Sequence, residues 1–399
     1  MNVSNNKKCY MIVFVITAAA VVVYLFCHRF NLLQPVIINE DKAVDNFIRM
    51  AAVDGSTESG VFASCEYNIQ NMVMLLLIKV CGNAWAGINI YYILTFFMIS
   101  FSMYCFLEKL EIPAMVSVGL AVMAAFLPFH IDRGEGQMMT SNFFLAPLLL
   151  CLFYDVIYCQ KPGVYSKKYI ALVCLAPFLD IRISVMAVLL FIVFLIQLHD
   201  WGYTKHIAWY LILLLFFTGL AGIISPTMSG SDIVMAKEEG MRILDLIMPM
   251  RYHIIGRLSD MRLEYDILLS AHGESGLNSL GALFSAGFVC MMFGLFFEWK
   301  KDRRIAWMGM ISMMVILIAG ICGVGSVIEY FGVNVTYWSR MAVFIAVCSV
   351  AVTGILLGNI LKRMESRKGG KVLWAGYAAM YIVFVVEFFE LILRRNMWY

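Results

Sequence analysis

Long hydrophobic runs, separated by short polar stretches, make up most of this chain. Many of the runs have the length of a helix that crosses a bilayer, and they carry few charges. The fifth and sixth runs are short, and Asp180 and Arg182 lie between them, so we interpret these two as a bent pair of helices. The pattern predicts an all-α, polytopic transmembrane bundle of about 11 spans. We place the spans at about 10–27, 85–106, 114–129, 143–158, 169–179, 183–198, 207–224, 280–297, 305–327, 341–361 and 372–393.

The basic residues between the predicted spans lie mainly in every second connection, and therefore on one side of the membrane. Lys7 and Lys8 precede the first span, and the connection after every second span is rich in lysine or arginine. Short loops of this kind stay in the cytoplasm. We therefore predict a cell-membrane protein with a cytoplasmic N-terminus, a C-terminus outside, and two long outer segments at about 28–84 and 225–279.

The composition agrees with an integral-membrane protein. Of the 399 residues, 62% are hydrophobic and 14% are charged, which excludes a soluble globular protein, and the net charge of +3 gives no reason to expect a nucleic-acid partner. We expect one membrane domain over residues 1–399, with an uncleaved first span and no soluble C-terminal domain. Most of the 11 cysteines lie in apolar runs, but Cys27 and Cys65 are both expected outside, where a disulfide between them remains open.

Parts of the two outer segments have apolar residues at helical spacing. This holds for residues 38–54, and for 71–82, an apolar stretch that is too short to span the bilayer. In the second segment Met241, Leu244 and Met248 fall on one helical face. We expect short helices at these places that lie along the membrane surface.

Two acidic residues in outer loops are candidates for chemistry. Asp45 lies one turn before Arg49, so it either faces a reaction site or pairs with Arg49 on a solvated face. Glu135 follows Arg133 in a loop whose glycines let the backbone approach a ligand. The alternative for this second loop is a capped hairpin in which Arg133 pairs with Asp132 or Glu135.

Several cations are placed where they can meet a phosphate. Arg251, His253 and Arg257 cluster near an expected interface, where guanidinium groups suit a phosphate or pyrophosphate. The other interpretation is ordinary anchoring to anionic headgroups. Arg340 lies where a span begins, so it can reach a lipid phosphate from the rim of the bundle.

Three of the polar residues inside the predicted spans are singled out. Asn89 is expected to hydrogen-bond a neighbouring helix rather than a ligand. Glu387 and Glu390 lie one turn apart near the outer end of the last span. A buried acid in a membrane is a functional candidate, whereas an acid this close to the end can also reach water.

Five segments, taken in order, resemble bacterial membrane proteins related to the GT-C glycosyltransferases. Gln137 and Ser339 depart from the pattern, which has a histidine and an asparagine at these two places. The segments are the acid and aromatic at 45–47, N-x-Y-x-x-L-T-F at 89–96, F-L-P-F-H with R-G-E-G at 126–136, L-D-L-x-x-P-x-x-x-H at 244–253, and Ser-Arg at 339–340.

The resemblance implies a multi-span fold whose outer loops form a pocket at the membrane face. Such enzymes take a sugar from a polyprenyl-phosphate carrier and pass it to an acceptor outside the cytoplasm, such as a cell-envelope glycan, a lipid or a protein. On this resemblance Asp45 and Glu135 are the expected catalytic acids. The expected substrate-binding residues are Arg133, His253, Arg340 and Arg251.

The chemistry of such a transfer accounts for these residue types. A carboxylate can take the proton of the acceptor hydroxyl, and cations stabilise the lipid phosphate that leaves. The cofactor is not predicted, and a divalent cation is one way to stabilise the leaving group. Two other classes remain open, which are a lipid or solute transporter and a non-catalytic partner protein with a GT-C fold. Convergence of the acids and cations on one outer cavity would favour the enzyme.

Overall fold

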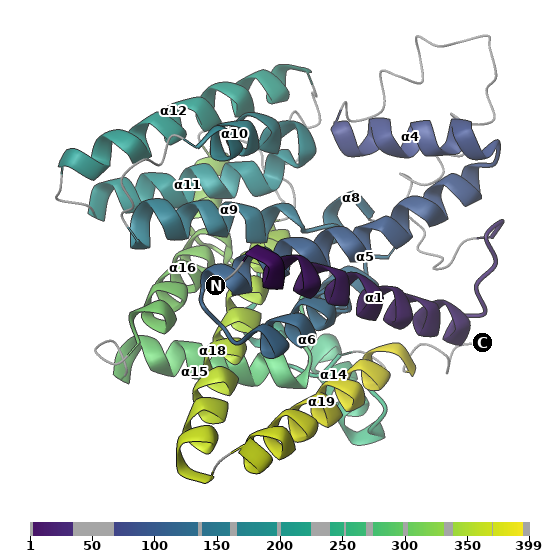
Figure 1. Cartoon of the computed structure of the whole chain (residues 1–399). Helices are drawn as coiled ribbons and strands as arrows, with labels where there is room; N and C mark the ends of the chain where they lie inside the picture. Colours follow the sequence, from purple (N-terminus) through teal and green to yellow (C-terminus); the bar gives the residue numbers. More distant parts are fainter. Residues whose placement is uncertain are drawn as a thin grey trace.

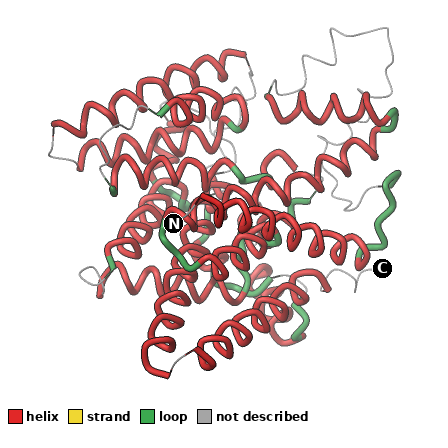
Figure 2. The backbone as a smooth tube through the Cα atoms, viewed as in Figure 1, coloured by secondary structure: helices red, strands yellow, loops and turns green. Residues whose placement is uncertain are grey.

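The computed structural model describes most of the chain as helices. The described residues are 3–34, 68–134, 138–159, 166–197, 201–224, 240–250, 253–268, 274–297, 302–330, 338–368 and 370–393. Within these ranges the backbone is helical or loop, with one isolated bridge between Met241 and Gly320 and no strand (Figure 2). The predicted all-α fold is confirmed for this part of the chain.

Most predicted apolar runs fall on helices in the described residues, whereas the run at 305–327, predicted as one span, is interrupted by a loop at 320–323 (Figure 1). The α-helices of the first half are α1 (Val3–Cys27), α4 (Ile69–Cys81), α5 (Ala84–Lys109), α6 (Ala114–Ala125), α7 (Pro128–Ile131), α8 (Met138–Ser141), α9 (Leu145–Phe153), α10 (Lys167–Leu179), α11 (Ile181–Gln197) and α12 (Trp201–Ile224). Those of the second half are α14 (Gly256–Leu268), α15 (Ala282–Phe297), α16 (Arg303–Ala319), α17 (Val324–Tyr330), α18 (Ala342–Lys368) and α19 (Gly370–Leu393). The π-helix η1 (Tyr154–Tyr158) continues α9, and the 3-10 helices are η3 (Ile243–Leu246), η4 (Glu274–Leu277) and η5 (Trp338–Met341).

Five stretches of the described chain are helical, long and apolar enough to cross a membrane. They are Lys7–Cys27, Ala84–Lys109, Ala114–Ile131, Trp338–Ser366 and Val372–Leu393. Shorter apolar helices occur at Ile69–Cys81, Leu145–Tyr158, Ile181–Ile196, Ile207–Ile223 and Ala282–Phe296. The chain therefore has the character of a multi-pass membrane protein.

Helix α18 forms the centre of the bundle. It packs against α5, α6, α9, α15, α16 and α19, and most of its residues are buried. In contrast, α1 and α19 lie at the edge, where α19 exposes Val383, Val385 and Val386. Because these exposed side chains are apolar, the outer helices present a surface that suits lipid.

Small residues allow α15 to approach the central helix closely. An added Cβ at Gly287 would lie 2.1 Å from Thr353 Oγ1. The hydroxyl of Ser349 on α18 donates a hydrogen bond to the carbonyl of Phe284 on α15. Apolar side chains gain little by leaving lipid for another helix, so close backbone contact and such hydrogen bonds stabilise helix pairs in a membrane.

The predicted bent pair is present as α10 and α11. The carboxylate of Asp180 accepts hydrogen bonds from the backbone N–H groups of Arg182 and Ile183, at 2.9 and 3.1 Å. An aspartate in this position caps the first turn of a helix, so it ends α10 and starts α11. This local break explains why the two apolar runs are short.

The predicted surface helices have different outcomes. The expected helix at 71–82 is confirmed as α4, which Asn68 caps at its start and Gly82, with a φ of +64°, ends. The expected helical face of Met241, Leu244 and Met248 is wrong, because only the 3-10 helix η3 forms there. Met241 instead bridges to the loop after α16, with its N–H bonded to the carbonyl of Ala319 at 2.8 Å. The expected helix at 38–54 lies outside the described residues, as does Cys65 of the cysteine pair considered above.

Polar contacts between helix ends define two ends of the bundle, which we call the motif end and the opposite end. At the opposite end, Lys109 forms an ion pair with Asp155, and the guanidinium of Arg304 donates to the carbonyl of Leu110 at 2.6 Å. Burial by itself would raise the pKa of the Asp302 carboxyl. The hydrogen bonds that Arg304 donates to this carboxylate outweigh the effect of burial, so the pKa of Asp302 lies below its usual value. The opposite end comprises residues 105–117, 155–159, 166–169, 302–304, 361–368 and 370–373. What we call the motif end comprises residues 28–34, 68–83, 126–134, 138–144, 240–250, 253–268, 274–281, 320–330, 338–341 and 387–393.

Candidate site at the motif end

The segment at 89–96 on α5 holds α4 and the loop after α1 in place. The side-chain amide of Asn89 donates to the carbonyls of Leu32 and Gln34, at 2.8 and 2.9 Å. The hydroxyl of Tyr91 donates to Gln70 on α4 at 2.8 Å. Asn89 therefore has a structural role, as expected, although its partner is the loop after α1 rather than a helix.

A histidine joins this segment to the next one. His130 Nε2 lies 2.8 Å from the hydroxyl of Thr95, and its Nδ1 lies 2.7 Å from the carbonyl of Ala125. A carbonyl only accepts, so Nδ1 carries a hydrogen. The ring is completely buried and lies against Tyr92 and Phe96, with ring centroids 5.4 and 4.4 Å away. Such a histidine positions helices and cannot contact a ligand in this conformation.

Arg133 is enclosed in the protein rather than open to a donor phosphate. Its guanidinium lies 3.9 Å from the ring centre of Phe129 and is completely buried. It donates to the carbonyl of Leu277 at 3.3 Å and to Asn278 Oδ1 at 3.0 Å. The planar guanidinium suits this combination of stacking and forked hydrogen bonding. Arg133 thus joins the loop after α6 to the loop before α15.

Asn278 carries the connection on to the segment at 339–340. Its side-chain amide donates to the carbonyl of Ser339 at 2.9 Å, and both residues are buried. Arg340 follows directly in the last turn of η5, where its side chain is partly exposed. Among the predicted site residues, Arg133 and Arg340 are therefore brought to one place by a residue that the sequence did not single out.

The segment at 244–253 is held by a second buried network. Asp245 accepts hydrogen bonds from Arg262 at 3.0 Å and from Ser275 at 2.5 Å. Arg262 also bonds Asp266 at 3.0 Å, and the side chains of Arg262 and Asp245 are each 1% exposed. Ser279 donates to the carbonyl of Met248 at 2.9 Å. These bonds fix η3, α14 and the loop before α15 as one unit.

His253 has a carboxylate partner on the last helix. Its Nε2 contacts the carboxylate of Glu390 on α19, while Nδ1 accepts the N–H of Ile255 at 3.0 Å. Because Nδ1 is an acceptor, the proton shared with Glu390 belongs to Nε2. Glu387, one turn earlier, accepts the N–H of Leu283 at 3.3 Å. The two acids inside the last span thus tie α19 to the motif end.

Three of the predicted site residues, namely Asp45, Glu135 and Arg251, lie outside the described residues. No group of three or more histidine, cysteine or acidic side chains that could hold a metal ion occurs in the part of the chain that the structure describes. The structure therefore places Arg133, Arg340 and His253 at the motif end and gives no position for the two predicted catalytic acids.

Two contributors to this site were missed in the sequence. Asn278 and Arg262 resemble ordinary polar residues of a long outer segment, and neither falls in a predicted motif. A usable signal for Asn278 was its place in the polar stretch directly before an apolar run, where a side chain can cap or cross-link helix ends.

Comparison with known proteins does not assign the chain to a family. The chain matches no described protein family, and no curated protein is significantly similar to it.

Proposed function

We propose that the protein is a membrane glycosyltransferase of the GT-C type. It would move a sugar from a polyprenyl-phosphate carrier to an extracytoplasmic acceptor, such as a cell-envelope glycan, a lipid or a protein. The site is the motif end of the bundle, where the spans meet water and a lipid-linked donor can present its phosphate.

One observation carries the proposal. The segments at 126–136, 244–253 and 339–340 are far apart in the sequence, yet their described residues lie at the motif end, and the segment at 89–96 on α5 contacts them. Thr95 contacts His130, Arg133 contacts Asn278, Asn278 contacts Ser339, and the neighbouring Ser279 contacts Met248. Segments selected only because they resemble one family would not be expected to share one end unless they serve one site.

The proposed topology follows from the same arrangement. We propose about 11 spans, formed by α1, α5, α6, α9 with η1, α10, α11, α12, α15, α16, α18 and α19. Lysine and arginine concentrate at the opposite end, which supports a cytoplasmic N-terminus there. The motif end then faces outward, on the side where carrier-linked sugars are used.

In this mechanism Asp45 takes the proton of the acceptor hydroxyl as its oxygen attacks the anomeric carbon. The bond from that carbon to the phosphate oxygen breaks, and the lipid phosphate leaves with the negative charge. Arg340 is partly exposed and stabilises this charge, with Arg251 as a second expected cation. Glu135 is the second expected catalytic acid. Attack opposite the phosphate inverts the anomeric centre. Arg133 is buried and bonded to protein groups, so it acts as a positioning residue.

A second candidate is a non-catalytic partner protein with the same fold. It is favoured by one observation, namely that Arg133 and His253 already have protein partners and are not presented to a ligand. A transporter is less well supported, because the polar side chains described here fasten helix ends and do not line a path through the bundle.

A transfer assay tests the proposal. Membrane vesicles that contain the full chain are supplied with labelled polyprenyl-phosphate sugars, and label in extracytoplasmic acceptors is measured. Asp45→Asn should lower transfer by about 100-fold or more, since it removes a general base. Arg340→Ala should raise the donor KM by about tenfold with a smaller effect on kcat, since it removes a phosphate contact.

The control is Lys79→Ala, which removes an exposed cation on α4 at the same end and should leave transfer unchanged. All variants are checked for yield and melting temperature. Full transfer by a folded Asp45→Asn protein would reject the base assignment. No transfer by the wild-type chain with any carrier-linked sugar would favour the non-catalytic partner.

A further inference from the structure

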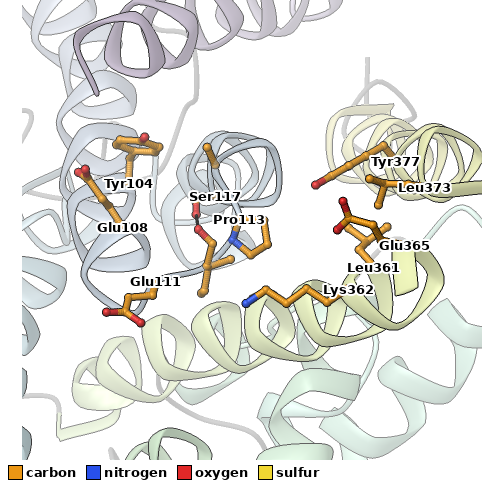
Figure 3. A pocket seen from close by; sticks show the side chains of 12 residues that line it. Tyr104, Glu108, Glu111, Pro113, Ser117, Leu361, Lys362, Glu365, Leu373 and Tyr377 are labelled. Atoms are coloured by element: carbon orange, nitrogen blue, oxygen red, sulfur yellow. Dashed lines mark hydrogen bonds between the residues drawn. The ribbon is translucent and has the colours of Figure 1, made fainter. Parts of the chain in front are cut away.

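The opposite end of the bundle contains a cavity that the proposed reaction does not use. It has a volume of about 640 Å³, within the size range of small-molecule sites. Its walls come from the end of α5, the start of α6, the end of α18 and the start of α19 (Figure 3). Each of these helices belongs to a stretch that is long and apolar enough to cross a membrane. The cavity therefore lies where spans end and lipid headgroups begin.

Charged groups of both signs line this cavity. Glu108 comes from the end of α5 and Glu111 from the loop that follows it, whereas Glu365 and Lys362 come from α18 (Figure 3). Three carboxylates against one ammonium give the lining a formal charge of −2. Glu108 accepts a hydrogen bond from Tyr10 at 3.1 Å, whereas no ion pair joins the other three charged groups to a described residue. The cavity thus favours a cationic group but also offers one cation.

The backbone at Glu111 is held in an unusual conformation. Its φ is +58°, in the left-handed region that glycine favours. The N–H of Glu111 donates to the carbonyl of Glu108 at 3.0 Å, and the N–H of Ile112 donates to the carbonyl of Leu107 at 3.4 Å. Two bonds of this kind close the C-terminal end of a helix, where the left-handed residue is usually glycine. Strain that a glycine would remove marks a residue whose side chain has a role. Here that side chain lines the cavity.

The apolar part of the lining points to a ligand with a hydrocarbon portion. Ile112, Pro113, Leu361 and Leu373 lie beside the charged groups, and Tyr104 and Tyr377 add two hydroxyls. A free inorganic cation would not use these side chains or Lys362. An anionic headgroup would meet three carboxylates. A zwitterion with a primary ammonium, a phosphate and an apolar tail matches the carboxylates, Lys362 and the apolar side chains of the lining.

We propose that this cavity binds the headgroup of an ethanolamine phospholipid. Its ammonium lies among the carboxylates that line the cavity, its phosphate accepts from Lys362, and its acyl chains follow the apolar side chains into the bilayer. The site lies at the opposite end from the motif segments, so its occupancy is independent of the transfer reaction proposed above.

Lipid selectivity of the wild-type chain is the first test and needs no variant. The detergent-purified full chain is titrated with dioleoyl phosphatidylethanolamine, phosphatidylcholine or phosphatidylglycerol, and bound lipid is counted by native mass spectrometry. One ethanolamine lipid should bind about fivefold more tightly than either of the others, because only it combines N–H donors with a phosphate and no net charge. Equal binding of the choline lipid, or tighter binding of the glycerol lipid, would overturn the proposal. Complete displacement by micromolar spermidine would also overturn it in favour of a soluble polyamine.

Three variants test the assigned groups. Glu111→Gly should lower the selectivity about fivefold without lowering the melting temperature, because glycine suits the left-handed backbone. Glu365→Gln should lower it similarly, and Lys362→Met should weaken ethanolamine and choline lipids alike. The matched control is Glu264→Gln, which neutralises an exposed acid on α14 at the motif end. Unchanged selectivity in Glu111→Gly would reject the site, as would an equal loss in the control.

Discussion

Arg262→Met should lower the free energy of unfolding by about 3–5 kcal/mol, because it leaves the buried carboxylate of Asp245 without its cation. Asp245 and Arg262 are each 1% exposed, and their atoms lie 3.0 Å apart. Asp245 would retain only Ser275 as a side-chain donor. Since this network fixes η3, α14 and the loop before α15 together, the loss should spread to the whole motif end. Thermal unfolding in detergent micelles measures it.

The control for this prediction is Arg257→Met, on the same helix but exposed, which should change stability by less than about 0.5 kcal/mol. The double variant Asp245→Leu with Arg262→Met should recover part of the loss, because an apolar pair needs no charge compensation. A single Arg262→Met protein as stable as the wild type would show that this buried pair does not hold the unit together.

Arg133→Met should lower the free energy of unfolding by about 3 kcal/mol. The side chain is completely buried, stacks on Phe129 and bonds Asn278, so its loss leaves a buried amide and a carbonyl without a donor. Arg133→Lys should recover only part of this, because a lysine cannot reproduce the flat, forked geometry. The measurement is the midpoint of chemical unfolding, with the transfer rate of the folded fraction recorded alongside.

The role assigned to Arg133 also distinguishes it from a phosphate contact. A positioning residue should change stability and transfer together, whereas a donor-binding residue should raise the donor KM in a protein of normal stability. Asn278→Ala should produce a smaller loss of stability, because Arg133 retains the carbonyls of Phe129 and Leu277. If Arg133→Met kept normal stability but raised KM, Arg133 would be a substrate contact instead.

Apolar run length was enough to predict most of the long apolar helices of this bundle, but not the polar helix α14. A span is a local property, because every backbone group is satisfied within the helix itself. The break at Asp180 was also readable, since capping depends on the next few residues. The region 241–248 was not, because Met241 bonds the loop after α16 and this distant partner overrides its local helical spacing.

The partners of the candidate site were much less predictable than the helices. Arg133 and Asn278 are 145 residues apart, and nothing local to either one indicates the other. The sequence suggested Asp132 or Glu135 as partners for Arg133, and it gave no sign of the distant carbonyl of Leu277 that the guanidinium also contacts. His253 was expected to bind a phosphate, and its contact with Glu390 depends on how α19 lies beside residues 253–255.

Cysteine labelling shows which side of the membrane the motif end faces. Glu264→Cys at the motif end and Ser366→Cys at the opposite end are made in a chain whose 11 natural cysteines are replaced, and both positions are exposed. Intact cells are treated with a maleimide that cannot cross the membrane. The account predicts labelling of position 264 in intact cells and of position 366 only after permeabilisation. The reverse pattern would place the motif segments in the cytoplasm and contradict a reaction at the outer face.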